Sequence, residues 1–188
     1  EIAKRVHERL TGSKEVLRLN YQPSYDPLPA PQGQFALPMQ VQVQRSGLSQ
    51  EKVKQGFIAR LAELRAEEIA RGITTIGPHR DEMRVLSNGI DLTDFGSRGQ
   101  IRTALLSLKL AEVDWLKEKS GQWPVLLLDE TLAELDTQRR AYLLDYLGNA
   151  EQVLLTTTDM NLFPHDFREK CERWRVVEGS VAQLGAKD

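Results

Sequence analysis

Residues 124–136 read Pro-Val-Leu-Leu-Leu-Asp-Glu-Thr-Leu-Ala-Glu-Leu-Asp. The uninterrupted apolar run at 125–128 is typical of a strand that is buried on both faces of a parallel sheet. Two carboxylates, Asp129 and Glu130, follow at the carboxyl end of this predicted strand, the edge at which α/β proteins bind ligands. An Asp there can hold Mg²⁺, usually through water, and a Glu can polarise an attacking water.

The residues around this stretch predict further helices and strands in alternation. A helix over about 100–119 precedes it, and we expect this helix to be substantially buried because its apolar residues cover a broad face: Ile101, Leu105, Leu108 and Trp115 with Leu106, Leu110 and Leu116. A helix over 137–147, a buried strand over 152–156 and a β-hairpin over 173–182 follow. The alternation predicts an α/β fold from about residue 73 onward.

The residues before 73 follow a different pattern. Alternating apolar residues predict strands over 14–21 and 39–45, with a proline-rich loop at 23–38 between them. Ser49 is a suitable cap for a helix that ends at Gly72. The apolar stripe of this helix, which we expect to pack in a core, comprises Val53, Phe57, Leu61 and Leu64. We therefore predict two domains: a helical arm lobe at 1–72 and an α/β domain at 73–188.

Composition limits the class of protein. The chain has 188 residues with a formal net charge of −2, so a strongly basic nucleic-acid-binding domain is not indicated. Its single cysteine, Cys171, excludes a disulfide framework and a zinc site built on several cysteines. The chain starts with Glu1, apparently inside a helix that has no start signal, so we expect a fragment of a longer protein. The alternative is a processed chain that has lost its initiator Met.

Three short motifs allow both a structural and a functional interpretation. The strand that ends in Asp129-Glu130 matches a Walker B pattern. Asp136 suits a helix N-cap, and its place after that pattern also suits the D-loop of an ABC-type ATPase. Ser97-Arg98-Gly99-Gln100 can cap a helix, and it can equally bind an anion at the helix N-terminus, as the ABC signature motif does. Their order along the chain favours an ABC-class ATPase.

The same motifs resemble those of the RecF recombination-repair ATPases of bacteria. The stretches that carry the resemblance are Gly77-Pro78-His79-Arg80-Asp81, Phe95 to Arg102, Leu126 to Glu130, and Ala133 to Asp136 with Arg139-Arg140. The resemblance covers most of the chain, as roughly the C-terminal half of such a protein. It implies the C-terminal part of an ABC-type ATPase head with a smaller helical and strand arm lobe.

The resemblance also implies site residues and cofactors, ATP and Mg²⁺. Asp129 would orient Mg²⁺, and Glu130 would activate the attacking water. The signature residues, Ser97, Arg98, Gly99 and Gln100, would bind ATP held by a second subunit. Asp136 would couple the two sites, and Thr158 stands where such ATPases usually carry a histidine. Because a neutral hydroxyl stabilises developing charge less well, we expect slow hydrolysis.

A phosphate loop, Gly-x-x-x-x-Gly-Lys-[Ser/Thr], occurs nowhere in the sequence, so we expect no ATP hydrolysis by this chain alone. The resemblance implies a cytoplasmic protein of DNA repair, recombination, replication and the SOS response. It would act as an ATP-driven homodimer that clamps single-strand/double-strand DNA junctions, with the RecR and RecO mediators and without a membrane. Two alternatives stay open: another ABC or SMC-like DNA-maintenance head, and a non-catalytic head that only binds a partner.

The basic residues around the motifs are less specific. His79 suits a hydrogen-bonded structural position in a turn. Arg80, Arg84, Arg98 and Arg102 could form part of a phosphate-binding surface, or they could be ordinary solvated charges.

Overall fold

The computed structural model describes residues 1–28 and 47–185, and the chain divides into two compact units. One unit joins the two ends of the chain, Glu1–Leu17 and Gly96–Asp188, and we call it the discontinuous unit. The other, Arg18–Phe95, is the inserted unit. This division differs from the predicted boundary between residues 72 and 73. The reason is that the first helix packs with elements that lie far along the chain. It therefore belongs to the discontinuous unit, whereas the residues from Arg18 onward belong to the inserted unit.

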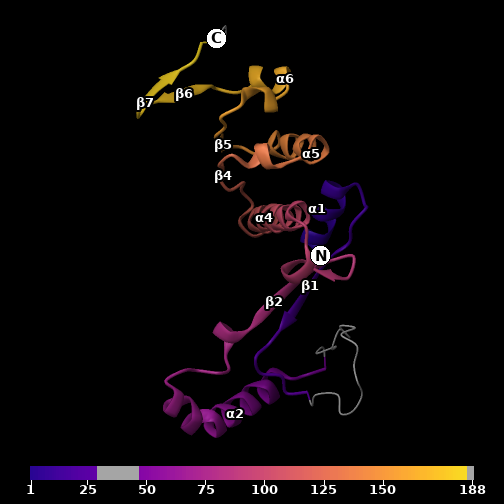
Figure 1. The fold of residues 1–188 in the computed structure, drawn as a ribbon, viewed down its shortest axis with the longest axis vertical. Coiled ribbons are helices and arrows are strands. Elements are labelled where there is room, and N and C mark those ends of the chain that lie inside the picture. The colour runs from indigo at the N-terminus through magenta and orange to yellow at the C-terminus, as the bar shows by residue number, and fades with distance from the viewer. Residues whose placement is uncertain (29–46, 186–188) are drawn as a thin grey trace. The chain divides into compact units, whose positions relative to one another are not determined.

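Figure 1 shows the helices and strands along the chain. They are α1 (Ile2–Thr11), β1 (Leu17–Gln22), α2 (Gln50–Arg71), η1 (Pro78–Arg80), β2 (Glu82–Ser87), β3 (Ile90–Asp91), α3 (Leu92–Phe95), α4 (Arg98–Ser120), β4 (Leu126–Leu128), η2 (Thr131–Glu134), α5 (Thr137–Leu147), β5 (Val153–Leu155), η3 (Met160–Leu162), α6 (His165–Glu169), β6 (Trp174–Val177) and β7 (Ser180–Gln183). Within the described residues, no helix is both long and apolar enough to cross a membrane.

The discontinuous unit contains a parallel pair of strands. β4 pairs with β5 so that Leu126 lies opposite Val153 and Leu128 opposite Leu155. Helix α1 lies beside α4 and also contacts α5 (Figure 1). The buried side chains of these elements form one core: Val6, Leu10, Leu110, Leu126, Leu132, Leu135, Leu143, Leu144, Leu147 and Phe163. The prediction of an α/β fold with parallel strands is confirmed.

The two parallel strands are covered on one face only in the described part of the chain. Leu126 is buried, whereas the next residue, Leu127, is 73% exposed, and Leu154 opposite it is 52% exposed. Successive side chains of a strand point to opposite faces, so one face of the pair meets the core and the other lies open. The prediction that these strands are covered on both faces was therefore wrong for the described residues.

Helix α4 buries its small residues rather than its largest ones. The buried residues of α4 are Thr103, Ala104, Ser107, Leu110 and Ala111. The predicted apolar side is largely exposed at Ile101, Leu105 and Trp115. Small side chains allow two helices to approach closely, and this face of α4 serves the contact with α1. The helix was predicted correctly, and Leu110 of its predicted apolar face is buried, but Ile101, Leu105 and Trp115 of that face are exposed.

The inserted unit contains a three-stranded sheet in the order β1-β2-β3. Asn88 and Gly89 both have positive φ between the antiparallel strands β2 and β3, as a two-residue hairpin turn requires. Helix α2 begins at its cap Ser49, as predicted, but none of its residues is buried. Phe57 packs against the ring of Tyr25, at 5.4 Å between centroids, and the expected core stripe is a half-buried face. The predicted strand at 39–45 and most of the proline-rich loop lie outside the described residues.

A fully buried histidine joins α1 to α4. The Nδ1 atom of His7 lies 3.0 Å from the hydroxyl oxygen of Ser107, and the imidazole is 0% exposed. Burial lowers the pKa of His7 below its ordinary value, and Arg139 on α5 lowers the pKa further. The carboxylates of Glu15 and of Glu8 on α1 act in the opposite direction, but burial is the largest effect. The native state therefore favours the neutral imidazole.

Acidification is expected to destabilise the discontinuous unit through His7. In the unfolded chain this histidine titrates near 6.5, so just below that pH the unfolded state binds more protons than the native state, and stability falls as the pH drops. The contribution of one group is at most about 1.4 kcal/mol per pH unit. Denaturant unfolding of the intact protein between about pH 7.5 and 5.5 measures it, and the His7→Asn variant is the control. Equal pH slopes in both proteins would contradict the assignment.

Candidate functional site

The carboxyl ends of the two parallel strands carry the first polar cluster. Asp129 follows β4 and Thr156 follows β5, where the hydroxyl of Thr156 donates a hydrogen bond to the Asp129 carboxylate. The same hydroxyl oxygen accepts from the backbone N–H of Glu130 at 3.2 Å, and the backbone N–H of Thr156 donates to the Leu128 carbonyl at 3.0 Å. Asp129 is thus held in place at the edge of the sheet, where it stays exposed.

The chain turns sharply directly after Asp129. Glu130 has φ of 49°, in the left-handed region that residues other than glycine seldom adopt. The short helix η2 follows, and its buried Leu132, together with Leu135, anchors the turn in the core. The half-buried Glu130 therefore occupies a fixed turn between the strand edge and the next helix.

Asp136 caps helix α5. Its carboxylate accepts a hydrogen bond from the backbone N–H of Arg139 at 2.9 Å and also contacts the Arg139 guanidinium. The backbone hydrogen bond from Arg139, with the nearby positive charge, lowers the pKa of Asp136. The structural interpretation of Asp136 as an N-cap is confirmed, and the carboxylate is ionised at neutral pH.

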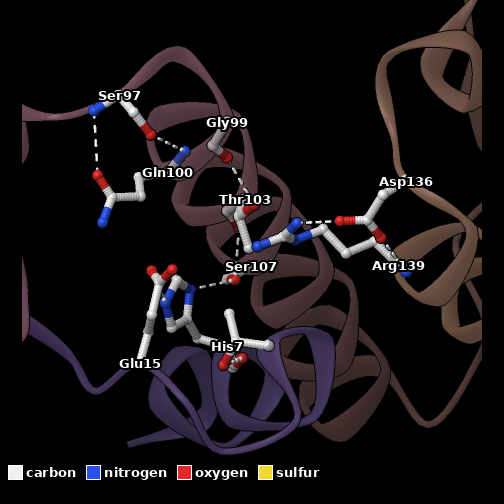
Figure 2. A network of polar contacts seen from close by, with 10 residues as sticks. His7, Glu15, Ser97, Gly99, Gln100, Thr103, Ser107, Asp136 and Arg139 are labelled. Carbon is white, nitrogen blue, oxygen red and sulfur yellow. Dashed lines mark hydrogen bonds and ion pairs between the residues drawn. The ribbon is translucent and has the colours of Figure 1, made fainter.

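Ser97 and Gln100 form a reciprocal cap at the start of α4 (Figure 2). The Ser97 hydroxyl oxygen accepts from the backbone N–H of Gln100 at 3.2 Å, and the Gln100 side chain accepts from the backbone N–H of Ser97 at 3.0 Å. Arg98 and Gly99 are exposed in the first turn, and a Cβ at Gly99 would meet nothing within 4 Å. The first N–H groups of a helix have no partner within the helix. The exposed first turn can therefore receive an anion.

The predicted site residues form three separate groups of contacts. Asp129 and Glu130 share Thr156, Ser97 pairs with Gln100, and Asp136 pairs with Arg139. Thr158 is exposed and takes no part in the hydrogen bonds recorded for Asp129 in the described ranges 1–28 and 47–185.

The Gly-Pro-His-Arg-Asp motif at 77–81 organises a turn of the inserted unit. Nε2 of His79 lies 2.6 Å from the Thr74 hydroxyl, and Nε of Arg80 donates to the Thr74 carbonyl at 2.7 Å. The Asp81 carboxylate accepts a hydrogen bond from the Tyr21 hydroxyl and another, at 2.7 Å, from the backbone N–H of Ser24. The hydrogen bond from Tyr21, together with the hydrogen bonds from Ser24, lowers the pKa of Asp81. The interpretation of His79 as a hydrogen-bonded turn residue is confirmed.

Two of the four arginines considered for a phosphate-binding surface have carboxylate partners. Arg84 contacts Asp91 at 2.7 Å within the inserted unit. Arg102 contacts Glu134 at 2.8 Å within the discontinuous unit. These pairs reduce the positive charge available to a phosphate, so the arginines give little independent support for such a surface.

Comparison with known proteins identifies the family. No protein-family model matches the chain. The protein named DNA replication and repair protein RecF from Acetivibrio thermocellus is 40% identical over 164 residues, which are 87% of this chain and 39% of that protein. The protein of the same name from Halalkalibacterium halodurans is 34% identical over 183 residues, which are 97% of this chain and 45% of that protein. The chain belongs to the RecF family.

Solved RecF structures support the same assignment. One, described as the recombination mediator protein RecF-ATPrS in the RecFOR pathway, matches with a TM-score of 0.68 and 26% identity over 97% of this chain and 44% of that chain. A second, described as RecF-ATP in the same pathway, matches with a TM-score of 0.66 and 28% identity. The chain spans less than half the length of these RecF proteins and corresponds to their C-terminal half. The predicted fold class, the C-terminal part of an ABC-type ATPase head, is confirmed.

The sequence analysis did not single out Thr156, which contacts Asp129 at the candidate site. It named Thr158, two residues further on, by resemblance to the position of a histidine. The register of the strands explains the pair: Leu128 lies opposite Leu155, so the residues that follow, Asp129 and Thr156, are neighbours at the sheet edge. The predicted strands, 124–128 and 152–156, would have placed Thr157, one residue further on, beside Asp129.

Proposed function

We propose that this chain supplies the signature motif, the Walker B carboxylates and the D-loop of an ABC-type ATPase that acts in DNA repair and replication. The observation that carries the proposal is the fixed position of Asp129 beside Thr156 at the carboxyl edge of a parallel sheet. Ligands of α/β proteins bind at this edge. The family relatives, which are named for DNA replication and repair, support the biological part of the proposal.

The residues at the sheet edge fit Mg²⁺. An exposed carboxylate and a hydroxyl are hard oxygen donors, the type that Mg²⁺ prefers. Within the described ranges, no group of three or more His, Cys, Asp or Glu side chains could enclose a metal ion by itself. A site with so few protein ligands suits Mg²⁺, because this ion usually binds one or two carboxylates and completes its coordination shell with water and substrate phosphates. Asp129 would hold the ion, and the ion would neutralise charge on the phosphates of ATP.

Glu130 is proposed as the residue that positions and polarises the attacking water. Its backbone N–H is tied to Thr156, and the left-handed turn keeps it next to Asp129. Thr158 is proposed to stand near the γ-phosphate as a neutral hydroxyl, so hydrolysis should be slow. A slow hydrolysis suits a protein in which ATP acts as a switch for association.

The phosphate loop is proposed to come from a part of the protein outside this sequence, which contains no such motif. The chain alone is then inactive as an ATPase. The first turn of α4, at Ser97, Arg98, Gly99 and Gln100, would bind the γ-phosphate of ATP held by a second subunit, and Asp136 would couple the two sites. ATP binding would therefore drive homodimer formation.

The dimer is proposed to act in the cytoplasm as a DNA clamp at single-strand/double-strand junctions, with RecR and RecO as partners. The support is the family membership and the description of the matched structures as parts of the RecFOR pathway. Because the net charge of this chain is −2, we expect DNA binding to require the assembled protein.

A charge at Ser97 tests the proposal. In the intact protein, Ser97→Asp is expected to weaken ATP-driven association at least about tenfold, because like charge opposes a phosphate at the helix end. Asp is as good an N-cap as Ser, so the free energy of unfolding should change little. Analytical ultracentrifugation with and without ATP measures the association.

The matched control is Ser120→Asp, at the other end of the same helix, where the Ser120 hydroxyl donates to the Leu116 carbonyl at 2.8 Å. This variant should associate with ATP like the unsubstituted protein. Normal association of Ser97→Asp, or an equal loss in both variants, would overturn the role of the signature turn.

A further inference from the structure

A chain of hydrogen bonds runs along α4 from its first turn to α1 (Figure 2). The Thr103 hydroxyl donates to the Gly99 carbonyl at 2.7 Å, and the Ser107 hydroxyl donates to the Thr103 carbonyl at 2.7 Å. His7 Nδ1 then lies 3.0 Å from the Ser107 hydroxyl oxygen. The spacing of four residues places Gly99, Thr103 and Ser107 on one face of the helix.

The hydrogen bond between His7 and Ser107 depends on the tautomer of the buried imidazole. A serine hydroxyl has a single proton, and where that of Ser107 goes to the Thr103 carbonyl, Nδ1 of His7 is the donor to the Ser107 oxygen. Nε2 lies 3.5 Å from the Glu15 carboxylate. The His7–Ser107 pair adds one buried polar bond to the packing of α1 against α4.

The end of α1 meets the other candidate motif. Gly12 terminates α1 with φ of 60°, and a Cβ at this residue would lie 2.8 Å from the amide nitrogen of Gln138. Gln138 is in the first turn of α5, two residues after Asp136. Val6 and Leu10 of α1 lie in the same buried core as Leu143 of α5. Helix α1 thus contacts the signature helix through His7 and the D-loop helix through Gly12.

We propose that α1 is a positioning element of the ATPase, and that His7 is its positioning residue, holding the signature turn of α4 in a fixed place relative to Asp136 on α5. The inference rests on the proposed function, because it assigns α1 the task of keeping two parts of one nucleotide site in register. His7 touches neither nucleotide nor metal in this role. It acts through Ser107, Thr103 and the Gly99 carbonyl.

Variants at both ends of the α1–α4 contact test the proposal in the intact protein. His7→Leu removes one partner of the His7–Ser107 bond and Ser107→Ala removes the other, so two variants probe the same bond. Thr11→Val is the matched control, because the buried Thr11 hydroxyl donates to the His7 carbonyl within α1, at 2.8 Å, and not to α4. His7→Asn can keep a donor near the Nδ1 position and serves as the rescue variant.

Two readouts separate positioning from stability. Hydrogen exchange of the Gln100 and Ile101 amides, without nucleotide, is expected to become roughly tenfold faster in His7→Leu and Ser107→Ala. The protein concentration at half-maximal association with ATP is expected to rise by about tenfold in the same variants, and less in His7→Asn. Thr11→Val should lower the unfolding midpoint without either change.

The outcomes distinguish the inference from the proposed function. Unchanged exchange at Gln100 and Ile101, or changes equal to those of Thr11→Val, would overturn the positioning role even if the unsubstituted protein associates with ATP. Faster exchange with unimpaired association would also overturn it. If the unsubstituted protein does not associate with ATP, the proposed function fails, and the role of α1 in that function fails with it.

Discussion

Replacing Glu130 with Gln in the intact protein is expected to lower ATP turnover about 100-fold or more and to leave ATP-driven association in place. Glutamine keeps the size of the side chain but cannot polarise or deprotonate water. The backbone N–H of residue 130 would still donate to Thr156, so the sheet edge should keep its structure. Steady-state phosphate release measures turnover, and sedimentation with ATP measures association.

The control for this prediction is Glu112→Gln, on helix α4. Glu112 is an exposed carboxylate paired with Lys109 at 3.1 Å, and exposed ion pairs contribute little to stability. Its loss should leave turnover within about twofold of normal. Normal turnover in Glu130→Gln would mean that the activating residue lies elsewhere. Loss of association together with turnover would instead assign Glu130 a role in ATP binding.

Truncation of Leu143 to Ala is expected to produce the largest loss of stability in the discontinuous unit, about 3 kcal/mol. The Leu143 side chain is 0% exposed and belongs to the core that α1, α4, β4 and α5 share. Truncation removes buried apolar surface and leaves a cavity that a well-packed core cannot fill. Denaturant unfolding of the intact protein, followed by a probe in this unit, measures the change.

Leu105→Ala is the matched control, because Leu105 on α4 is 57% exposed. Truncation there should cost less than about 1 kcal/mol, since little buried area is lost. Equal losses in the two variants would show that the exposed face of α4 is covered in the intact protein. A small loss at Leu143 would show that the core described above contributes little to stability.

Local chemistry allowed several elements to be predicted from the sequence. Asn88-Gly89 is typical of a two-residue turn because these residues tolerate positive φ, and the hairpin is present. Ser49, Ser97 and Asp136 were each suitable N-caps, and each accepts a hydrogen bond from a backbone N–H of its helix. The acids at the sheet edge followed from an apolar run that ends in two carboxylates.

The remaining features depend on contacts between distant residues, and local patterns do not contain that information. The position of α1 beside α4 could not be predicted, because apolar periodicity shows that a helix has a buried face but not which element covers it. The buried polar contact between His7 and Ser107 was missed for the same reason: a histidine and a serine in helices usually suggest exposure. The half-buried state of α2 shows that an apolar stripe need not become a core.

The inserted unit leaves the discontinuous unit at residue 17 and returns to it at residue 96. The inserted unit is therefore one continuous segment that begins and ends at the discontinuous unit. The entropy of closing a flexible loop grows only with the logarithm of its length, so that doubling a flexible segment costs about 0.6 kcal/mol. We therefore expect the core of the discontinuous unit to tolerate additions or deletions within residues 18–95. The same changes within residues 1–17 would displace helix α1 from that core.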